Sequence, residues 1–350
     1  MMKQQTPELK IDLKLYCPRP TCPFYLAEDN KIIKDGTYCT KNDNEPRQMF
    51  CCRLGKHRFS ETAYSELFGK HGSFKQYEQV AKLSCYGLSA DEIADVLGLD
   101  VRTVISWQRC MGKKVHRFHE LICTLLTLNV LFVQMDELWS YLGKKRKQLW
   151  VFIGLEVESR FWLNFELGSR TTHTATKLVS GIKKLLKSNF LDKPLKITTD
   201  KLAAYKNALE KQFKDISYVY LQIVKQRLHK RLITVKKCFV KGSEKDFTGK
   251  SQNTSYIERF NLTLRQRVSY LQRKSLGYCK NKARFNDVLW LNLFDYNYCR
   301  RQKSLRVEFQ QPSRRFQKKW QHRTPAMAIG LTKHPLNWRF LLLCPVRLNC

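Results

Sequence analysis

Acidic residues are scarce in this sequence of 350 residues. It contains 30 Asp and Glu against 64 Lys and Arg, which gives a formal charge of +34 at neutral pH. An imbalance of this size predicts an extended polyanion as partner, either a nucleic acid or an anionic membrane.

Long apolar segments are also lacking. The longest apolar run, residues 121–135, is shorter than the roughly 20 residues that a spanning helix needs, and Thr and Asn interrupt it. No apolar signal-peptide segment follows the first Met. The tryptophans lie mostly in strand-like runs and not on a basic amphipathic helix, which disfavours a membrane-surface protein. We therefore expect a nucleic-acid partner and no membrane.

Low-complexity tracts and internal repeats are absent, and 43% of the residues are hydrophobic, so the chain should fold around a sizeable core. Its length suggests two or more domains. The 13 cysteines are an odd number in a chain without a secretory signal. This favours reduced thiols in a cytosol over a disulfide framework.

Residues 15–60 are rich in Cys and Pro and poor in helical periodicity. "CPRPTC" resembles one metal knuckle, and "FCCRLGKHRFSE" resembles the second half of a zinc ribbon. The second knuckle is imperfect, because Gly55 stands where a second cysteine is usual. Bound zinc and a degenerate ribbon without metal therefore both stay open. The candidate zinc ligands are Cys17, Cys22, Cys52 and His57, with Cys39 and Cys51 as alternatives.

Residues 87–109 carry the pattern of a helix-turn-helix. Ser89 and Glu92 form a predicted capping box, Gly98 supplies the turn, and Asp100 should cap the second helix. Leu97, Leu99, Val104 and Trp107 are the expected buried set. A plain helical hairpin is the alternative, but the basic outer face favours DNA binding. The outward-facing candidates are Arg102, Ser106 and Arg109.

From residue 129 the pattern changes to strands. Three strand-like runs are followed by a helix, a strand near 195–200, a helix, a strand near 216–224, an irregular basic segment at 225–252 and two helices. This order predicts a mixed α/β sheet. We place Asp136 and Asp200 at strand ends, where ligand sites form in open α/β folds.

Glu258 begins a helix in "NTSYIERFNLTLRQR" and has two interpretations. It could close a capping box with Ser255, or it could join Asp136 and Asp200 in an oxygen-rich site for Mg²⁺ or Mn²⁺. Arg265 lies seven residues later, on the same helical face. Three converging carboxylates would raise one another's pKa, and a divalent cation compensates for this.

The segments "MDELWSYLGKKRKQLWVF", "TTDKLAAYKNAL" and "TSYIERFNLTLRQRVSYLQRKSLGYCKNKARFNDVL" resemble the insertion-sequence-one family of DDE transposases. The resemblance spans residues 130–300 and implies a ribonuclease-H-like catalytic domain after a zinc ribbon and a helix-turn-helix. It departs from the family in the broken ribbon and in a longer spacing before Glu258, which predicts an inserted hairpin or loop near 225–252.

The resemblance implies four regions: a zinc-ribbon-like module (1–65), a helix-turn-helix (66–118) with a linker helix to 128, a DDE domain (129–305) and a basic tail (306–350). It also implies that Asp136, Asp200 and Glu258 are catalytic and hold two Mg²⁺ or Mn²⁺ ions, with Zn²⁺ a candidate in the N-terminal module. The basic residues that would contact DNA phosphates are Arg259, Arg265, Arg267, Arg273 and Lys274.

The implied reaction is hydrolysis of a phosphodiester at a transposon end, followed by attack of the freed 3′-hydroxyl on target DNA. Because two ends must be joined, a homo-oligomer on DNA is expected, in a prokaryotic cytosol and at the nucleoid when bound. Two alternatives stay open: a catalytically silent or domesticated DNA-binding protein, and a ribonuclease-H-like nuclease that does not join strands.

Overall fold

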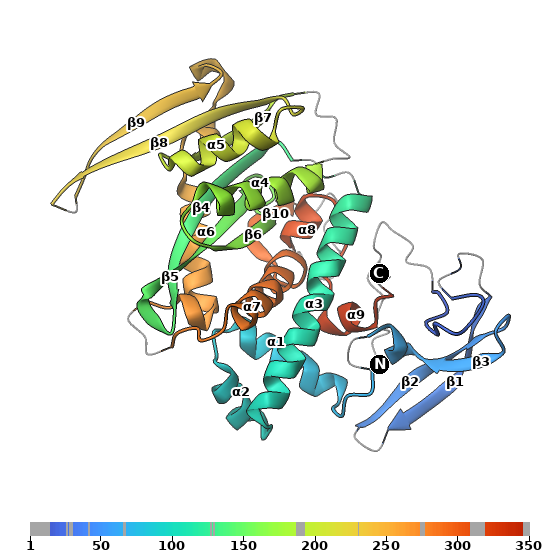
Figure 1. The fold of residues 1–350 in the computed structure, drawn as a ribbon. Helices are drawn as coiled ribbons and strands as arrows, with labels where there is room; N and C mark the ends of the chain where they lie inside the picture. Colours follow the sequence, from blue (N-terminus) through green and yellow to red (C-terminus); the bar gives the residue numbers. More distant parts are fainter. Residues whose placement is uncertain are drawn as a thin grey trace.

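A six-stranded mixed sheet with flanking helices forms the centre of the molecule (Figure 1). The computed structural model describes residues 15–345 except 26, 28–30, 41–42, 66–67, 127, 129, 187–192, 230, 274–276 and 309–318. In the sheet the strands run in the order β6-β5-β4-β7-β8-β9. Their bounds are β4 Phe132–Leu142, β5 Lys144–Glu156, β6 Trp162–Gly168, β7 Leu195–Asp200, β8 Tyr218–Leu228 and β9 Arg231–Lys241.

The first three strands of this sheet form an antiparallel meander, and β7 and β8 then run parallel to β4. Parallel strands need a crossover connection. Helix α4 (Thr172–Leu186) leads from β6 to β7, and α5 (Ala203–Gln212) leads from β7 to β8. The predicted mixed α/β sheet of ribonuclease-H-like order is confirmed.

Side chains along β4 point alternately to the two faces of the sheet, and this determines which helices pack against each face. Val133 and Met135 pack beside Ile182 of α4 and Leu209 of α5. The opposite face at Gln134 receives α6 (Ser255–Arg267), because the Gln134 side chain bonds the backbone at Asn253 and Ile257. The central strand is thus covered on both faces.

The N-terminal module is a three-stranded antiparallel sheet with a small aromatic core of its own. Its strands are β1 Ile32–Thr40, β2 Asp43–Cys52 and β3 His57–Ser60, followed by the 3-10 turn η1 Glu61–Tyr64. The buried Lys114 ammonium links this module to the C-terminal segment, because it donates to the carbonyls of Tyr64 and Cys344.

Three helices follow the module: α1 Phe74–Cys85, α2 Ala90–Leu97 and α3 Val101–Leu125. The predicted caps are confirmed: Ser89 and Glu92 form a capping box, Gly98 is left-handed, and Asp100 caps α3. In the predicted buried set, Val104 and Trp107 are buried and Leu97 and Leu99 are half-buried. The segment expected to be a linker helix up to residue 128 is the continuation of α3, which runs unbroken to Leu125.

The C-terminal part continues through α7 (Lys282–Phe294) and a π-helical turn (Asp295–Cys299). The segment expected to be only a basic tail contains structure: α8 and α9 pack onto the body, and Ala326, Trp338 and Leu341 are buried in the main core. The remaining elements are β10 Gln302–Glu308, β11 Trp320–Arg323, α8 Pro325–Ala328, α9 Trp338–Leu343 and the 3-10 turns η2 Glu244–Asp246, η3 Gly249–Gln252 and η4 Ser269–Leu271.

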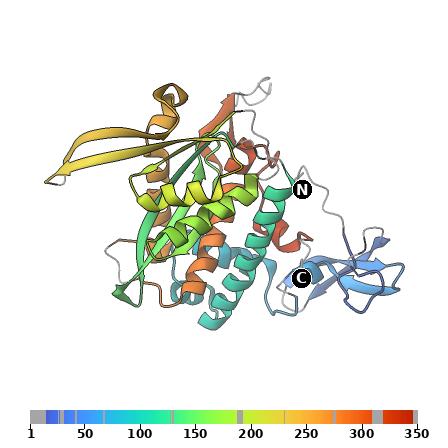
Figure 2. The same cartoon turned by 45° about the horizontal axis from the view of Figure 1, so that its top comes forward.

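Residues 225–252 are less irregular than the pattern indicated. Strand β8 extends to Leu228, and β9 returns antiparallel to it, so a β-hairpin occupies the place of the expected insertion. The hairpin projects from the body (Figure 2). Of the helices that the structure describes, none is both apolar and long enough to cross a bilayer.

Candidate active site

Asp136 and Glu137 are adjacent on β4, so their side chains leave the strand toward opposite faces of the sheet. Asp136 faces α6, where Asn261 Nδ2 donates to its Oδ2 over 2.7 Å. Glu137 faces α4 and α5. Strand β7 pairs with β4 only over Phe132–Gln134, so the sheet is open beside both acids. This opening lets two opposed side chains reach one space.

The prediction that Asp136 ends its strand was wrong, because β4 continues to Leu142 in a hairpin with β5. The apolar run stops at Asp136, but cross-strand pairing extends the strand beyond it. Asp200 does end β7, as predicted. Its Oδ1 accepts from the backbone N–H of Leu202 at the start of α5.

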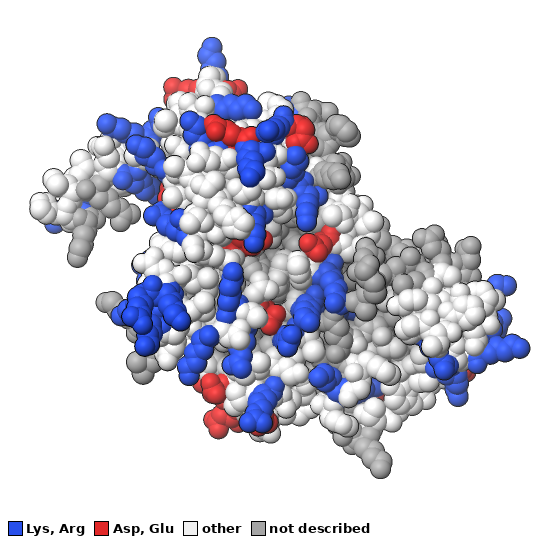
Figure 3. Space-filling model, in the orientation of Figure 1, with Lys and Arg blue, Asp and Glu red and all other residues white. Residues whose placement is uncertain are grey.

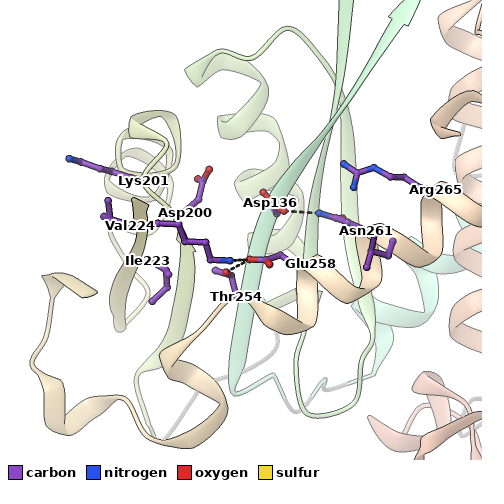
Figure 4. A pocket seen from close by; sticks show the side chains of 11 residues that line it. Asp136, Asp200, Lys201, Ile223, Val224, Thr254, Glu258, Asn261 and Arg265 are labelled. Atoms are coloured by element: carbon purple, nitrogen blue, oxygen red, sulfur yellow. Dashed lines mark hydrogen bonds and ion pairs between the residues drawn. The ribbon is translucent and has the colours of Figure 1, made fainter. Parts of the chain in front are cut away.

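Carboxylate oxygens of Asp136, Glu137 and Asp200 lie within 4.8 Å of one another. Glu258 lines the same cavity but does not belong to this close group (Figure 4). Its carboxylate accepts from Thr254 Oγ1 and pairs with Lys225 of β8. The capping box between Ser255 and Glu258 was wrong, since Thr254 is the N-cap and Glu258 lies one residue beyond the box position.

The cavity between β4, β7, β8 and α6 has a volume of about 500 Å³. Asn261 lines it, and its buried Oδ1 has no hydrogen-bond partner among the residues described. The donors that face the cavity are therefore oxygens, which suits a hard divalent cation. The lining residues are Asp136, Asp200, Lys201, Ile223, Val224, Lys225, Thr254, Glu258, Asn261, Leu262 and Arg265.

Burial, together with the charges of Glu137 and Asp200, raises the pKa of Asp136 to about 7. Burial likewise raises the pKa of Glu137, while Arg170 opposes the rise. These shifts express the cost of gathering carboxylates in a partly dry site. A cation bound among them would remove that cost.

Sequence reasoning missed Glu137, which is buried (9% exposed). Arg170 donates to Glu137 Oε1 through Nε (2.8 Å) and Nη2 (2.5 Å), and Tyr205 Oη donates to Oε2 (3.1 Å). Arg170 Nη2 also lies 4.0 Å from Asp200. The signal was a charged residue at an inward position of an apolar strand, directly after Asp136.

The predicted phosphate-contacting residues separate into two groups. Arg265 lines the acidic cavity, and burial and the charge of Arg273 lower its pKa. Arg259 lies on the other side of α6, in a second cavity of about 570 Å³ with Arg160 and further basic residues. Arg267 donates to the Cys85 carbonyl of α1. Lys274 lies outside the described residues.

In the predicted helix-turn-helix, Arg102 and Arg109 are exposed on α3. Ser106 is only half-buried and accepts a hydrogen bond from Lys70 (3.3 Å). The three predicted side chains therefore share the exposed side of the helix.

The four zinc candidates come together in the N-terminal module. The sulfurs of Cys17, Cys22 and Cys52 and a ring nitrogen of His57 lie within 4.8 Å of one another. His57 Nδ1 lies 3.0 Å from the Gly55 carbonyl, which leaves Nε2, 3.1 Å from Cys17 Sγ, to face the cluster. Such a carbonyl contact commonly orients a metal-binding histidine.

Gly55, which broke the expected spacing, is required by the packing of this cluster. A Cβ there would lie 2.5 Å from Cys22 Sγ and 2.8 Å from the His57 ring. His57 thus supplies the fourth donor from β3 in place of the missing cysteine. The alternatives Cys39 and Cys51 do not take part in the cluster.

Comparisons with known proteins point to one family. Residues 129–244 match the family model described as IS1 transposase. This segment is similar to the IS1 transposase family. It contains Asp136, Glu137 and Asp200, whereas Glu258 lies beyond it.

Two curated relatives are similar to this chain in sequence. The insertion element IS1 protein InsB of Shigella flexneri is 27% identical over 169 residues, covering 48% of this chain and 98% of the relative. The insertion element IS1 4 protein InsB of Escherichia coli (strain K12) is 26% identical over 172 residues, covering 48% and 77%.

Two solved structures are also similar in part. The Mos1 mariner paired end complex with Mn has 14% identity and a TM-score of 0.21, covering 43% of this chain and 60% of that one. The Mos1 transposase paired-end complex with left transposon end has 12% identity and a TM-score of 0.18, covering 41% and 59%. The chain thus spans about three fifths of these structures.

Proposed function

We propose that this chain is the DNA transposase of an insertion sequence and acts by metal-assisted phosphoryl transfer at Asp136, Asp200 and Glu258. One observation carries the proposal: acids from two strands of the IS1-like segment and from helix α6, which follows that segment, line one cavity together with Arg265.

Asp136, Asp200 and Glu258 would hold divalent metal, which when bound activates the attacking oxygen and neutralises charge at phosphorus. The oxygen-rich donor set and the orphaned Asn261 Oδ1 fit such an ion. Asn261 fixes the orientation of Asp136, and Arg265 is a desolvated cation at the cavity wall where a phosphate would lie.

In the proposed reaction the oxygen of a water forms a bond to phosphorus, and the bond to the 3′-oxygen breaks to leave a 3′-hydroxyl. That hydroxyl then attacks a phosphodiester of target DNA and displaces another 3′-oxygen. Each step exchanges one P–O bond for another, so no oxidant or covalent enzyme intermediate is needed.

The cleavage and joining assay uses labelled duplexes made from the DNA that flanks the coding region. Wild-type protein with Mg²⁺ should cleave and join them, and Asp200→Ala should abolish both reactions. Joining by Asp200→Ala would refute the catalytic assignment. Cleavage without joining by the wild type would favour a nuclease.

Glu137 and Glu258 compete for the role of third metal ligand, since Glu137 lies closer to the two aspartates. We favour Glu258, because Arg170 and Tyr205 already compensate the charge of Glu137. Calorimetric titration with Mn²⁺ separates the two: Glu258→Gln should weaken binding at least tenfold and Glu137→Gln less. The reverse order would assign the site to Glu137.

We further propose that Cys17, Cys22, Cys52 and His57 bind one Zn²⁺, which would stabilise the N-terminal module. Elemental analysis of purified protein should find one zinc per chain, and Cys52→Ala should lose it. Absence of zinc from wild-type protein refolded with the metal would leave the alternative of a metal-free ribbon.

The exposed face of α3, with Arg102 and Arg109, is proposed to recognise transposon-end DNA. The four-region division of the chain, assembly as a homo-oligomer on DNA and action in the cytosol, where the DNA lies, belong to the same proposal. Footprinting on DNA with and without Arg102→Ala tests the recognition face, which should lose sequence-dependent protection.

A further inference from the structure

The β8–β9 hairpin leaves the body of the protein and stands in solvent (Figures 1 and 2). Strand β8 is buried up to Ile223, whereas β9 is exposed at every residue from Arg231 to Cys238. We call residues 226–237 the arm. At about 3.4 Å per residue its strands extend roughly 20 Å beyond the sheet.

The arm is basic and contains no acid. Its sequence, "QRLHKRLITVKK", has five Lys and Arg and no Asp or Glu. No described ion pair engages Arg231 or Lys236. A surface of this kind attracts a polyanion and repels another copy of a chain whose net charge is +34.

The arm also exposes apolar side chains close together. Leu228 is 60% exposed, Leu232 53%, Ile233 61% and Val235 46%. Figure 3 shows this projecting part as largely uncharged surface, with Lys and Arg gathered where it joins the body. A pair of strands alone is marginally stable in water, so exposed apolar residues on one indicate a surface that is covered in use.

The base of the arm forms one wall of the acidic cavity. Ile223, Val224 and Lys225 line it, and Lys225 pairs with Glu258. Lys237, at the other strand, donates to Gln252 just before α6 (2.7 Å). The root of the arm therefore lies directly beside the acidic cavity.

We propose that the arm grips duplex DNA next to the scissile phosphate. A two-stranded β-ribbon fits the major groove of B-DNA. Arg231 and Lys236 contact phosphates, and Leu232 and Ile233 pack against base edges in the groove. The inference rests on the proposed function for its geometry at the cavity, but the grip itself needs neither metal nor catalysis.

The test measures affinity of the full chain for a mixed-sequence linear duplex, without metal, across a salt series. Arg231→Ala/Lys236→Ala should weaken binding roughly tenfold and lower the slope of log K against log salt by about 2. The matched control Lys184→Ala/Lys211→Ala removes two exposed charges at the far ends of α4 and α5 and should change K less than about twofold.

Leu232→Ser/Ile233→Ser separates packing from charge. It should weaken binding several-fold at every salt concentration while leaving the slope unchanged. Far-UV circular dichroism and the thermal midpoint confirm that each variant is folded. Equal effects of the arm and control pairs would overturn the inference, as would a serine variant that loses self-association but binds DNA normally.

The same measurements distinguish failure of the arm from failure of the proposed function. If wild-type protein never cleaves DNA but Arg231→Ala/Lys236→Ala still changes the salt slope, DNA binding by the arm is supported and the transposase reaction is refuted. If cleavage proceeds and the arm variants bind and cleave as wild type does, the inference about the arm alone is refuted.

Discussion

Asp136 and Glu137 occupy consecutive positions, yet their surroundings differ because a strand sends neighbouring side chains to opposite faces. Asp136 meets a single neutral donor, Asn261, and its pKa rises to about 7. Glu137 accepts hydrogen bonds from the Arg170 guanidinium and the Tyr205 hydroxyl. One acid is thus left to be compensated by a cation from solution, and the other is compensated by the fold.

We expect the Glu137–Arg170 pair to be energetically coupled. Arg170→Ala leaves a buried carboxylate without its cation and should cost about 1–2 kcal/mol, a value reduced because Arg170 is itself half-exposed. Adding Glu137→Gln removes the stranded charge and should restore part of that loss. Urea unfolding of both single variants and the double variant measures the coupling.

The surface pair Lys206 and Glu210, 3.9 Å apart on α5, is the matched control and should give coupling near zero. Additive effects at Glu137 and Arg170 would mean that solvent already screens their interaction.

His119 on α3 predicts a pH dependence of stability. It is fully buried between the Leu163 carbonyl (2.8 Å) and Tyr298 Oη (3.1 Å), and burial lowers its pKa to about 4 from 6.5. Between pH 6.5 and 4 the unfolded chain therefore takes up a proton at His119 that the folded chain does not bind. The free energy of unfolding that neutral His119 contributes is lost as pH falls from 6.5 through 4. The loss is at most about 3 kcal/mol.

His119→Gln should unfold with a flatter pH dependence between 6.5 and 4 than the wild type, whatever its absolute stability. Denaturant midpoints at four or more pH values provide the comparison. Parallel curves for the two proteins would show that His119 takes up its proton without cost.

At the scale of elements, helices α3 and α7 approach each other closely at Gly112. A Cβ there would lie 3.0 Å from the backbone of Asp287. Glycine inside a helix normally costs about 1 kcal/mol relative to alanine, so Gly112→Ala would be stabilising on an isolated helix. Contact between the backbones reverses this expectation.

We predict that Gly112→Ala lowers the free energy of unfolding by about 1–2 kcal/mol, because the strain of overpacking exceeds the gain in helix propensity. Thermal and urea unfolding measure the change. Thr124→Ala, at an exposed position of the same helix, should be neutral or stabilising. A more stable Gly112→Ala would show that α3 and α7 can separate without loss.

Local patterns were enough to predict several of these elements. The caps at Ser89, Gly98 and Asp100 and the strand ending at Asp200 are set by residues a few positions apart, so sequence periodicity reveals them. The extension of β4 past Asp136 depends instead on pairing with β5. The apolar run of β4 does not by itself predict this extension, because the extension requires β5 as a pairing partner.

The candidate site was predictable only in part, for the same reason. Asp136, Asp200 and Glu258 line one cavity, as expected, but the partners of Glu258 come from elsewhere: Lys225 belongs to another strand. Likewise, Arg170 reaches Glu137 from the loop before α4. Contacts between residues so distant in sequence leave no periodic pattern to find.

At the scale of the whole molecule, basic surfaces lie on both sides of α6. Arg265 faces the acidic cavity, and on the other side Arg259 and Arg160 line a second cavity with Arg300, Arg301 and Lys303. A helix with cations along two faces can lie between two nucleic-acid segments. This arrangement agrees with a protein that must bring separate DNA segments together.

Charge also predicts when the protein assembles. A net charge of +34 makes copies repel one another at low salt, and DNA neutralises that repulsion. We therefore expect monomers without DNA and two protomers on DNA carrying paired ends, measured by light scattering coupled to size-exclusion chromatography. Asp200→Asn should assemble as the wild type does, since binding precedes chemistry. One protomer per DNA at saturation, or a dimer already formed without DNA, would contradict assembly driven by the ends and would require a protein interface that forms despite the charge.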